Sequence, residues 1–234
     1  MQRLTSFGER LSLADGPTVD FFSVPYPTRM AVAELDGGLW VWSPVELDED
    51  LEREVRALGD VRWVVSPNKI HHLFIGPWLE AFPEASAFGP PGLAARREDL
   101  AFAGELTDTP DEGWAHDIDQ VIVGGSPVMD EVLFFHRPSS TCIVGDLIQR
   151  HDPESFDGWR RAMMKLDGMV GPAGSTPREW RASFFRRGEA REALDKALGW
   201  QPERLVIAHG ACAAVGGTEV LETGLHWITR AWPA

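Results

Sequence analysis

Apolar and polar residues follow one another along the chain in patterns that predict alternating strands and helices. Residues 29–35 and 38–44, "RMAVAEL" and "GLWVWSP", are two apolar runs joined by Asp-Gly-Gly, which is typical of a β-hairpin. In 48–59, "DEDLEREVRALG", apolar residues recur at helical spacing after an acidic first turn, and Gly59 ends the helix. Residues 61–67, "VRWVVSP", are apolar throughout, as buried parallel strands are. This strand–helix–strand order indicates an α/β protein.

The rest of the chain divides into two strand-rich sections, each followed by helices. We predict strands within 86–89, 119–125, 130–137, 141–148 and 204–210, and helices within 76–85 (opened by Pro77), 93–99, 155–169, 176–185, 188–200 and 218–232. Two such halves fit a four-layer α-β-β-α sandwich, with one doubly wound sheet as the alternative. The prediction is a single domain over residues 1–234.

Composition and charge narrow the classes of partner. The 234 residues are 44% hydrophobic, as in globular proteins, and the formal net charge of −14 opposes binding to nucleic acid or to an anionic membrane surface. The partner we expect is a small-molecule substrate, while the sequence is silent on oligomeric state. Two cysteines cannot form a disulfide framework. With neither a signal peptide nor an apolar span in the sequence, we expect a cytoplasmic protein.

Three predicted strands are each followed by residues of the kind that bind metal ions. His71 and His72 follow the strand at 61–65, Asp146 closes "TCIVGD", and His209 closes "RLVIAHG". In open α/β sheets, ligands gather outside the carboxyl ends of strands. Imidazole and carboxylate groups bind zinc, and also iron or manganese. Taken singly, each of these residues is as well explained by capping a turn or by a hydrogen bond in the core.

These residues lie in segments that resemble a known family. "SPNKIHH" (66–72), "VGDL" (144–147) and "AHG" (208–210) are similar to segments of the metallo-β-lactamase fold superfamily, and the resemblance runs from about residue 25 to 225. The match is to an uncharacterised branch, a domain of unknown function, often described as metal-dependent hydrolases. The resemblance implies the four-layer sandwich of the metallo-β-lactamase type and a metal-binding hydrolase site.

The first motif of that superfamily, Thr-His-x-His-x-Asp-His, is incomplete in this chain. Ser66 takes the place of the threonine, and Pro67 and Lys69 stand where the first two histidines belong. His71 replaces the aspartate, and His72 matches the last histidine. The usual third ligand of the same metal is also missing, because its counterpart "GGSP" (124–127) contains no histidine. The resemblance therefore implies that one of the two metal positions is lost.

The other metal position keeps a full set of candidate ligands. By the resemblance these are His71, His72, Asp146 and His209, the same four residues that follow the predicted strands. We therefore predict a mononuclear site for one divalent metal ion, with zinc as the first choice and iron or manganese as alternatives. Four protein ligands would fill a tetrahedron, so either the metal becomes five- or six-coordinate, or one histidine is not a ligand and acts as a base or hydrogen-bonding group. His71 is set aside first, because it departs from the family pattern.

Other residues are weaker candidates for supporting the ligands or touching substrate. They are Asn68 and Lys69 in the histidine loop, and Glu131 and His136, which fall on opposite faces of one strand. For Lys69 a solvated loop lysine, and for His136 a structural histidine, are the competing explanations. His116, His151 and His226 follow no useful pattern, and no catalytic residue is assigned.

Three functions remain open from the sequence. The first is a metal-dependent hydrolase with a degenerate site, acting on a small ester, amide, thioester or phosphoester. The second is a non-catalytic protein of the same fold with a structural or ligand-binding role, suggested by the lost ligands. The third is a redox or oxygen-handling iron protein, because three histidines and a carboxylate also suit iron. Fold alone does not separate these functions.

Overall fold

The computed structural model of the chain describes residues 2–21, 24–172 and 174–229. These residues form two compact units, which are described in turn below. The first unit comprises residues 1–120 and 136–139, and the second comprises 121–135 and 140–234, in each case where described. Among the described residues, no helix has the length and apolar character needed to span a membrane.

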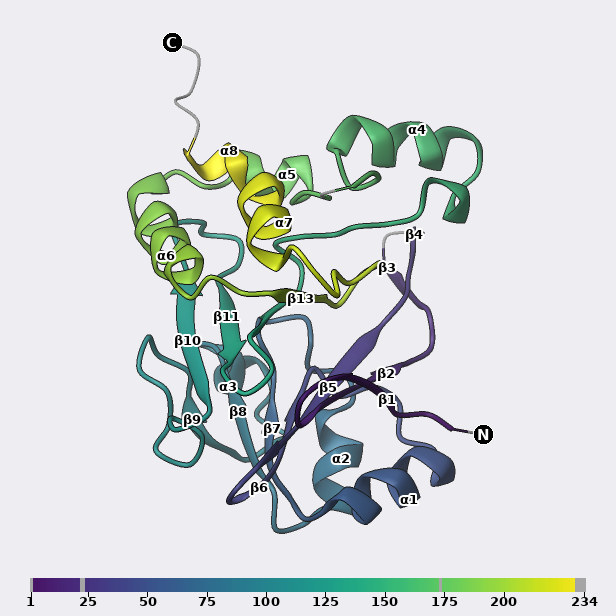
Figure 1. The fold of residues 1–234 in the computed structure, drawn as a ribbon, viewed down its shortest axis with the longest axis vertical. Helices are drawn as coiled ribbons and strands as arrows, with labels where there is room; N and C mark the ends of the chain where they lie inside the picture. Colours follow the sequence, from purple (N-terminus) through teal and green to yellow (C-terminus); the bar gives the residue numbers. More distant parts are fainter. Residues whose placement is uncertain (1, 22–23, 173, 230–234) are drawn as a thin grey trace. The chain divides into compact units, whose positions relative to one another are not determined.

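The first unit is built on a seven-stranded mixed sheet (Figure 1). The strands, in spatial order, are β1 (Thr5–Gly8), β2 (Leu11–Asp15), β5 (Arg29–Leu35), β6 (Gly38–Trp42), β7 (Val61–Val65), β8 (Ser86–Gly89) and β9 (Phe102–Glu105). Strands β1, β2, β5 and β6 pair antiparallel, and β6, β7, β8 and β9 run parallel to one another. A separate two-stranded ribbon consists of β3 (Val19–Phe21) and β4 (Val24–Tyr26).

Helices α1 (Glu49–Leu58) and α2 (Ile75–Ala81) cover one face of this sheet (Figure 1). Leu51 and Val55 lie four residues apart and therefore on the same face of α1, and both are fully buried in the hydrophobic core of this unit. Leu58, at the end of the helix, is 38% exposed. The side chain of Asp48 accepts the backbone N–H of Leu51 and so caps the helix. The structure thus confirms three predictions: the hairpin β5–β6, the helix that ends at Gly59, and the parallel strand β7.

Sequence periodicity missed the strands of the N-terminal region and β9. Strands β1 and β2 are short and carry polar residues, so the sequence pattern marks them poorly. Strand β2 is held by ladder pairing to β5, and β1 by pairing to β2. Helix α2 begins at Ile75, two residues before the expected opening at Pro77, so that the proline lies in the first turn. The short helix α3 (Leu93–Arg96) follows the Pro-Gly turn as expected.

The second unit contains a four-stranded sheet in the order β10 (Ile118–Val123), β11 (Glu131–His136), β12 (Thr141–Val144) and β13 (Arg204–Ile207). Its core is lined by the apolar face of this sheet and by helices packed against it. The helices of this unit are η1 (Pro153–Ser155), α4 (Gly158–Asp167), α5 (Arg178–Ala182), α6 (Arg187–Gly199), α7 (Gly217–Gly224) and α8 (His226–Thr229). The last predicted helix is thus divided at Leu225, and its residues 230–232 lie outside the described residues.

The described strands form two mixed sheets and a ribbon, which excludes the doubly wound single sheet that the sequence left open. Strand β12 pairs in parallel with β13, with Val144 opposite Ile207. The chain between these strands includes helices α4, α5 and α6, as a parallel connection requires. This register brings the segments that follow β12 and β13 to the same edge of the sheet.

Candidate metal centre

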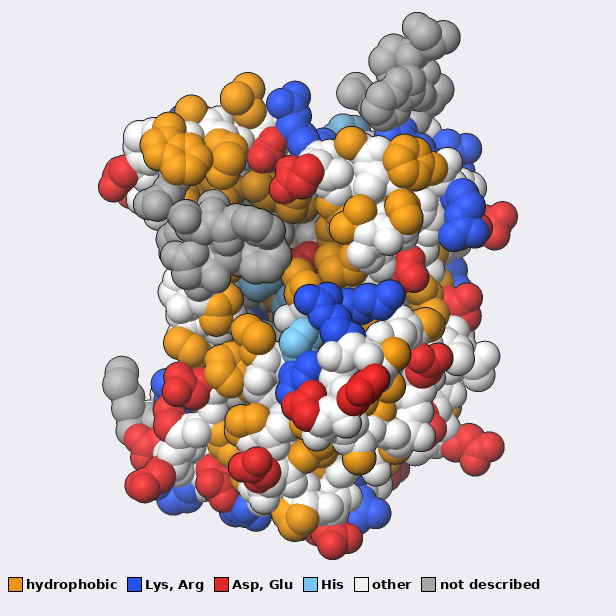
Figure 2. Space-filling model, turned by 180° about the vertical axis from the view of Figure 1, so that it is seen from behind, with side chains coloured by type: hydrophobic (Ala, Val, Ile, Leu, Met, Phe, Trp, Pro, Cys, Tyr) orange, Lys and Arg blue, Asp and Glu red, His pale blue; other side chains and the backbone are white. Residues whose placement is uncertain are grey.

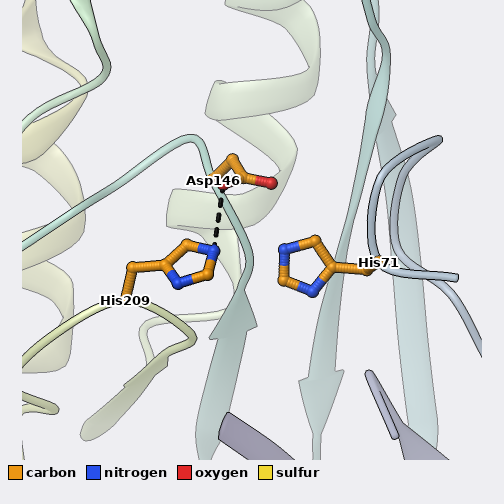
Figure 3. A group of neighbouring side chains, drawn as sticks. All are labelled: His71, Asp146 and His209. Atoms are coloured by element: carbon orange, nitrogen blue, oxygen red, sulfur yellow. Dashed lines mark ion pairs between the residues drawn. The ribbon is translucent and has the colours of Figure 1, made fainter. Parts of the chain in front are cut away.

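Asp146 and His209 are brought together by the register of β12 and β13. Each residue follows its strand by two positions, and the last residues of the two strands, Val144 and Ile207, are partners in the ladder. The carboxylate Oδ1 of Asp146 lies 3.1 Å from Nε2 of His209, as the dashed line in Figure 3 marks. Both residues are buried. The expectation that these two strand ends converge is therefore confirmed.

The loop that carries Asp146 is organised by the buried carboxylate of Glu131. Oε1 of Glu131 accepts the backbone N–H groups of Gly145 at 2.9 Å and Leu147 at 3.3 Å, and Oε2 accepts that of Asp146 at 2.6 Å. Glu131 is fully buried at the start of β11. Three amide donors satisfy a charge that would otherwise be costly in the core, and in return they hold the loop in one conformation. Glu131 thus acts on the candidate centre through the backbone.

The loop that carries His209 is fixed by a close approach of two backbone segments. The N–H of Arg150 donates to the carbonyl of His209 at 3.0 Å, and the N–H of Ala211 donates to the carbonyl of Arg150 at 2.8 Å. Gly210 has a φ of 116°, and a Cβ at this position would lie 2.0 Å from the carbonyl oxygen of Arg150. Only glycine fits here, which explains why the histidine is followed by glycine in "AHG".

Two further polar residues of the second unit adjoin Asp146, and the sequence argument missed both. Nε2 of Gln149 lies 3.5 Å from Oδ1 of Asp146, at the limit of a hydrogen bond, and Nε2 of His151 donates to Oε1 of Gln149 at 3.3 Å. Burial, reinforced by the charge of His209, lowers the pKa of His151 to about 4, so its ring is neutral at pH 7. The spacing Asp-x-x-Gln-x-His after a buried strand was the available signal.

In the first unit, the loop after β7 is built by Ser66 and Asn68. Oγ of Ser66 donates to the backbone carbonyl of Asn68 at 2.8 Å. The buried side-chain oxygen of Asn68 accepts the N–H of Ile70 at 3.0 Å and that of His71 at 3.2 Å. This pattern is an Asx-type turn, which sets the direction in which the chain enters the turn holding His71 and His72. Asn68 therefore shapes the loop.

His71 is hydrogen-bonded to a serine on the neighbouring strand end. Its Nδ1 lies 2.6 Å from Oγ of Ser43, which directly follows β6 and is buried. Ser43 has a φ of 50°, a left-handed conformation that costs a residue with a side chain about 1 kcal/mol or more. Its backbone N–H donates to the carbonyl of Val65 at 2.8 Å, which continues the β6–β7 pairing. The imidazole of His71 is thus oriented through its Nδ1.

His72 is held instead by Arg97. Nη1 of Arg97 lies 2.8 Å from Nδ1 of His72 and 3.0 Å from its carbonyl oxygen, and the same guanidinium binds Asp99 through Nη2 at 2.7 Å. A guanidinium only donates hydrogen bonds, so Nδ1 of His72 is the acceptor and the proton of the neutral ring lies on Nε2. Burial, followed by the charges of Arg97 and Arg96, lowers the pKa of His72.

The remaining candidates occupy separate positions. His136 is buried at the opposite end of β11 from Glu131, and its Nδ1 is hydrogen-bonded to Oγ of Ser139 at 2.7 Å. Burial lowers the pKa of His136 to about 4, so this ring is also neutral at pH 7. Lys69 is half-buried in the histidine loop. The sequence predicts that Glu131 and His136 lie on opposite faces of β11. In the structure, Glu131 binds its partners at the start of the strand, and His136 binds Ser139 just beyond its end.

Comparison with known proteins gives the fold. A metallo-β-lactamase from Hirschia baltica superposes with a TM-score of 0.65 at 14% identity, over 98% of each chain. The metallo-β-lactamase FIM-1 from Pseudomonas aeruginosa, solved in its mono-zinc form, gives a TM-score of 0.63 at 11% identity, over 97% of this chain and 94% of its own. One from Pontibacter korlensis gives 0.62 at 13%, over 97% and 99%. The chain therefore has the metallo-β-lactamase fold predicted from the sequence.

The sequence comparisons are less informative about activity. The family model that matches residues 18–157 is described as "Domain of unknown function (DUF4336)". None of the curated proteins matches the chain. The fold thus places a histidine and an aspartate, both of metal-ligand type, next to each other at the edge of a sheet.

Proposed function

Because the chain belongs to the family described as "Domain of unknown function (DUF4336)", whose description states no activity, we propose a function from the chemistry of its own residues. The proposal is a metal-dependent hydrolase with one divalent cation, acting on a small ester, amide, thioester or phosphoester. The observation that carries it is the buried pair Asp146–His209 in a chain with the metallo-β-lactamase fold.

The donor atoms of this pair fit a shared cation. Zinc binds histidine nitrogen and carboxylate oxygen at about 2.0 to 2.2 Å, so two such ligands in a tetrahedral site lie about 3.3 to 3.6 Å apart. The separation of 3.1 Å between Nε2 of His209 and Oδ1 of Asp146 is slightly below that spacing, so a small shift of either side chain would let both bind one ion. Neutral imidazole with carboxylate suits zinc first, and iron or manganese as alternatives. The similar FIM-1 structure, which was solved with a single zinc, supports the choice of one ion.

We assign His71 as the third ligand, in preference to His72. Nδ1 of His71 faces Oγ of Ser43, and in the tautomer that donates from Nδ1 the lone pair of the neutral ring lies on Nε2, the atom that would bind the cation. His72 has Nδ1 engaged by Arg97 and a proton on Nε2, so it has no lone pair to offer. Three protein ligands leave one position of a tetrahedron open. This choice retains the histidine that the sequence argument set aside first, and it makes His72 a hydrogen-bond donor to substrate.

The cation and the residues of the chain would have different roles in the reaction. When bound, a divalent cation polarises a carbonyl or phosphoryl oxygen and lowers the pKa of water. Asp146 and His209 would hold the cation, with His71 as the proposed third ligand, and Glu131 fixes the backbone on which Asp146 stands. The N–H at Nε2 of His72 donates to the substrate, held in place by Arg97 through the other ring nitrogen. Burial of Asp146 and His209 keeps competing water away from the ligands.

Removing the hydroxyl of Ser43 tests the assignment of His71. Ser43→Ala is expected to weaken zinc binding by about 10- to 100-fold, the usual cost of losing a partner behind a metal-bound histidine. The measurement is competition with a chromogenic zinc chelator. Ser140→Ala is the matched control, because Ser140 also has a left-handed backbone (φ 48°) but lies in the turn between β11 and β12. Equal zinc affinity in the two variants would remove His71 from the ligand set.

The proposed function itself is tested on the unaltered chain. Protein purified without chelator or affinity nickel is expected to contain about one zinc, iron or manganese ion per chain by elemental analysis. A panel of small esters, amides, thioesters and phosphoesters is expected to include a substrate whose hydrolysis stops on chelation and returns with the metal. A chain that takes up no metal even after reconstitution would contradict the proposal.

The second candidate, a non-catalytic protein of this fold, rests on a specific observation. Pro67 and Lys69 stand at two positions where the family resemblance places histidines, and Gly124–Pro127 lacks the third. Near-stoichiometric metal with no hydrolysis across the whole panel would favour this candidate over the hydrolase. Redox activity of an iron-loaded chain would favour the iron protein instead.

A further inference from the structure

Most arginines of the first unit are neutralised by nearby carboxylates, as expected in a chain with 36 acidic and 22 basic residues. The pairs are Arg10–Asp36, Arg29–Asp15, Arg53–Asp50, Arg56–Glu52 and Arg137–Asp119. Lys69 and Arg96 differ. Within the described ranges, neither side chain makes an ion pair or a hydrogen bond, although both lie beside the histidine loop. Two such cations together in an acidic protein call for an explanation.

Lys69 and Arg96 lie close to His72 on adjacent segments. Nζ of Lys69 is 3.4 Å from the point where a Cβ on Gly92 would stand, and Gly92 is the residue that precedes α3. Arg96 is the last residue of α3. Arg97, the next residue, donates to His72 directly. We call Lys69, Arg96 and Arg97 the basic cluster.

Of the carboxylates near the basic cluster, Asp99 and Glu105 are already engaged, and Glu98 is exposed and forms no ion pair with Lys69 or Arg96 in the described part of the chain. Asp99 accepts two hydrogen bonds from Arg97, and Oε1 of Glu105 accepts the backbone N–H of Gly92 at 2.9 Å. Lys69 and Arg96 therefore keep their charge available to an outside group. On the face drawn in Figure 2, Lys and Arg side chains gather beside a histidine near the middle of the view.

We propose that Lys69 and Arg96 bind an anionic group of the substrate, a carboxylate or a phosphate, separate from the bond that is hydrolysed. Lysine and arginine bind both groups by charge-assisted hydrogen bonds. Lys69 is only two residues from His71, so the anion would be bound next to the cleaved bond. The inference rests on the proposed function, and it narrows the substrates to esters, amides, thioesters or phosphoesters that carry a second, negatively charged group.

The test uses metal-free protein, so that the anion cannot bind to a metal ion instead. Chelator-treated full chain at low ionic strength is titrated with inorganic phosphate and, separately, with acetate, and backbone amide shifts are followed by NMR. At least one anion is expected to shift the amides of residues 69–72 and 92–97. The double variant Lys69→Gln/Arg96→Gln is expected to weaken that binding at least about tenfold. The tighter of the two anions identifies the group as phosphate or carboxylate.

Arg62→Gln is the matched control, because it removes one positive charge at the start of β7, whereas Lys69 follows the end of that strand. It is expected to leave anion binding unchanged. No shift with either anion in the unaltered chain, or equal binding by the double variant, would overturn the inference. Metal content, measured on the same preparations before chelation, reports separately on the proposed function, so either proposal can fail while the other stands.

Discussion

His209→Gln and Asp146→Asn are each expected to abolish stoichiometric metal binding while leaving the chain folded. Both changes keep the size of the side chain, but glutamine and asparagine amides are poor substitutes for an imidazole and a charged carboxylate as ligands of zinc. Loss of a partner behind a ligand already costs about 10- to 100-fold in affinity, so loss of a ligand should cost more than about 100-fold. Elemental analysis and chelator competition measure the effect.

The control is the same substitution at a histidine outside the centre. His226 is exposed in α8, where its Nδ1 is bonded to the carbonyl of Thr223 at 2.7 Å. His226→Gln should therefore bind zinc and hydrolyse substrate like the unaltered chain. Circular dichroism distinguishes a lost ligand from a lost fold. Full metal occupancy in both His209→Gln and Asp146→Asn would place any bound cation elsewhere and end the proposed function.

The same variants separate catalysis from metal binding in a graded way. If the cation supplies the reactivity, the rate of hydrolysis should rise in proportion to metal occupancy as zinc is added back to the metal-free chain. His72→Gln is expected to behave differently, because His72 is assigned to substrate and not to the cation. It should retain about one metal per chain and lose about 100-fold in kcat/KM, the low end of what a positioned proton donor contributes.

The parts of the fold that sequence predicts are those in which one local pattern decides the outcome. Strand β7 is apolar except at Arg62, and α1 carries a cap, an acidic first turn and a terminal glycine, so both were found. Asp146 and His209 were found because each closes an apolar strand, and parallel pairing of neighbouring strands brings such ends together. The N-terminal strands depend on pairing with β5, which no pattern within "TSFG" or "LSLAD" records.

The residues that support the candidate centre were harder to predict. Ser43 follows β6 and His71 lies 28 positions later, so their contact depends on the β6–β7 pairing and on the left-handed turn at the serine. Gln149 reaches Asp146 from a loop outside the named strands and helices, and His151 contacts Gln149. Strand alternation assigns Glu131 to a face, but it gives no indication that the carboxylate accepts three consecutive amides. Such contacts depend on tertiary structure.

Glu131→Gln is expected to lower the free energy of unfolding by about 2 kcal/mol and to weaken metal binding about tenfold. The carboxylate accepts the amides of Gly145 and Leu147 on one oxygen and that of Asp146 on the other. A glutamine has one acceptor oxygen, so its NH₂ group must face at least one backbone N–H with no acceptor between them. Buried donors left without partners cost about 1 to 3 kcal/mol, and the loop that positions Asp146 loosens.

Urea unfolding of metal-free protein measures the stability change, and chelator competition measures the affinity. Glu222→Gln, at an exposed position of α7, removes the same charge without touching a buried amide and should stay within about 0.5 kcal/mol of the unaltered chain. Because Glu131 contacts only the backbone that carries Asp146, its loss should reduce metal affinity less than the loss of Asp146 does. If Glu131→Gln has the same unfolding midpoint and zinc affinity as Glu222→Gln, the hydrogen bonds from the three amides to the carboxylate do not stabilise the loop. Other contacts would then hold the loop in place.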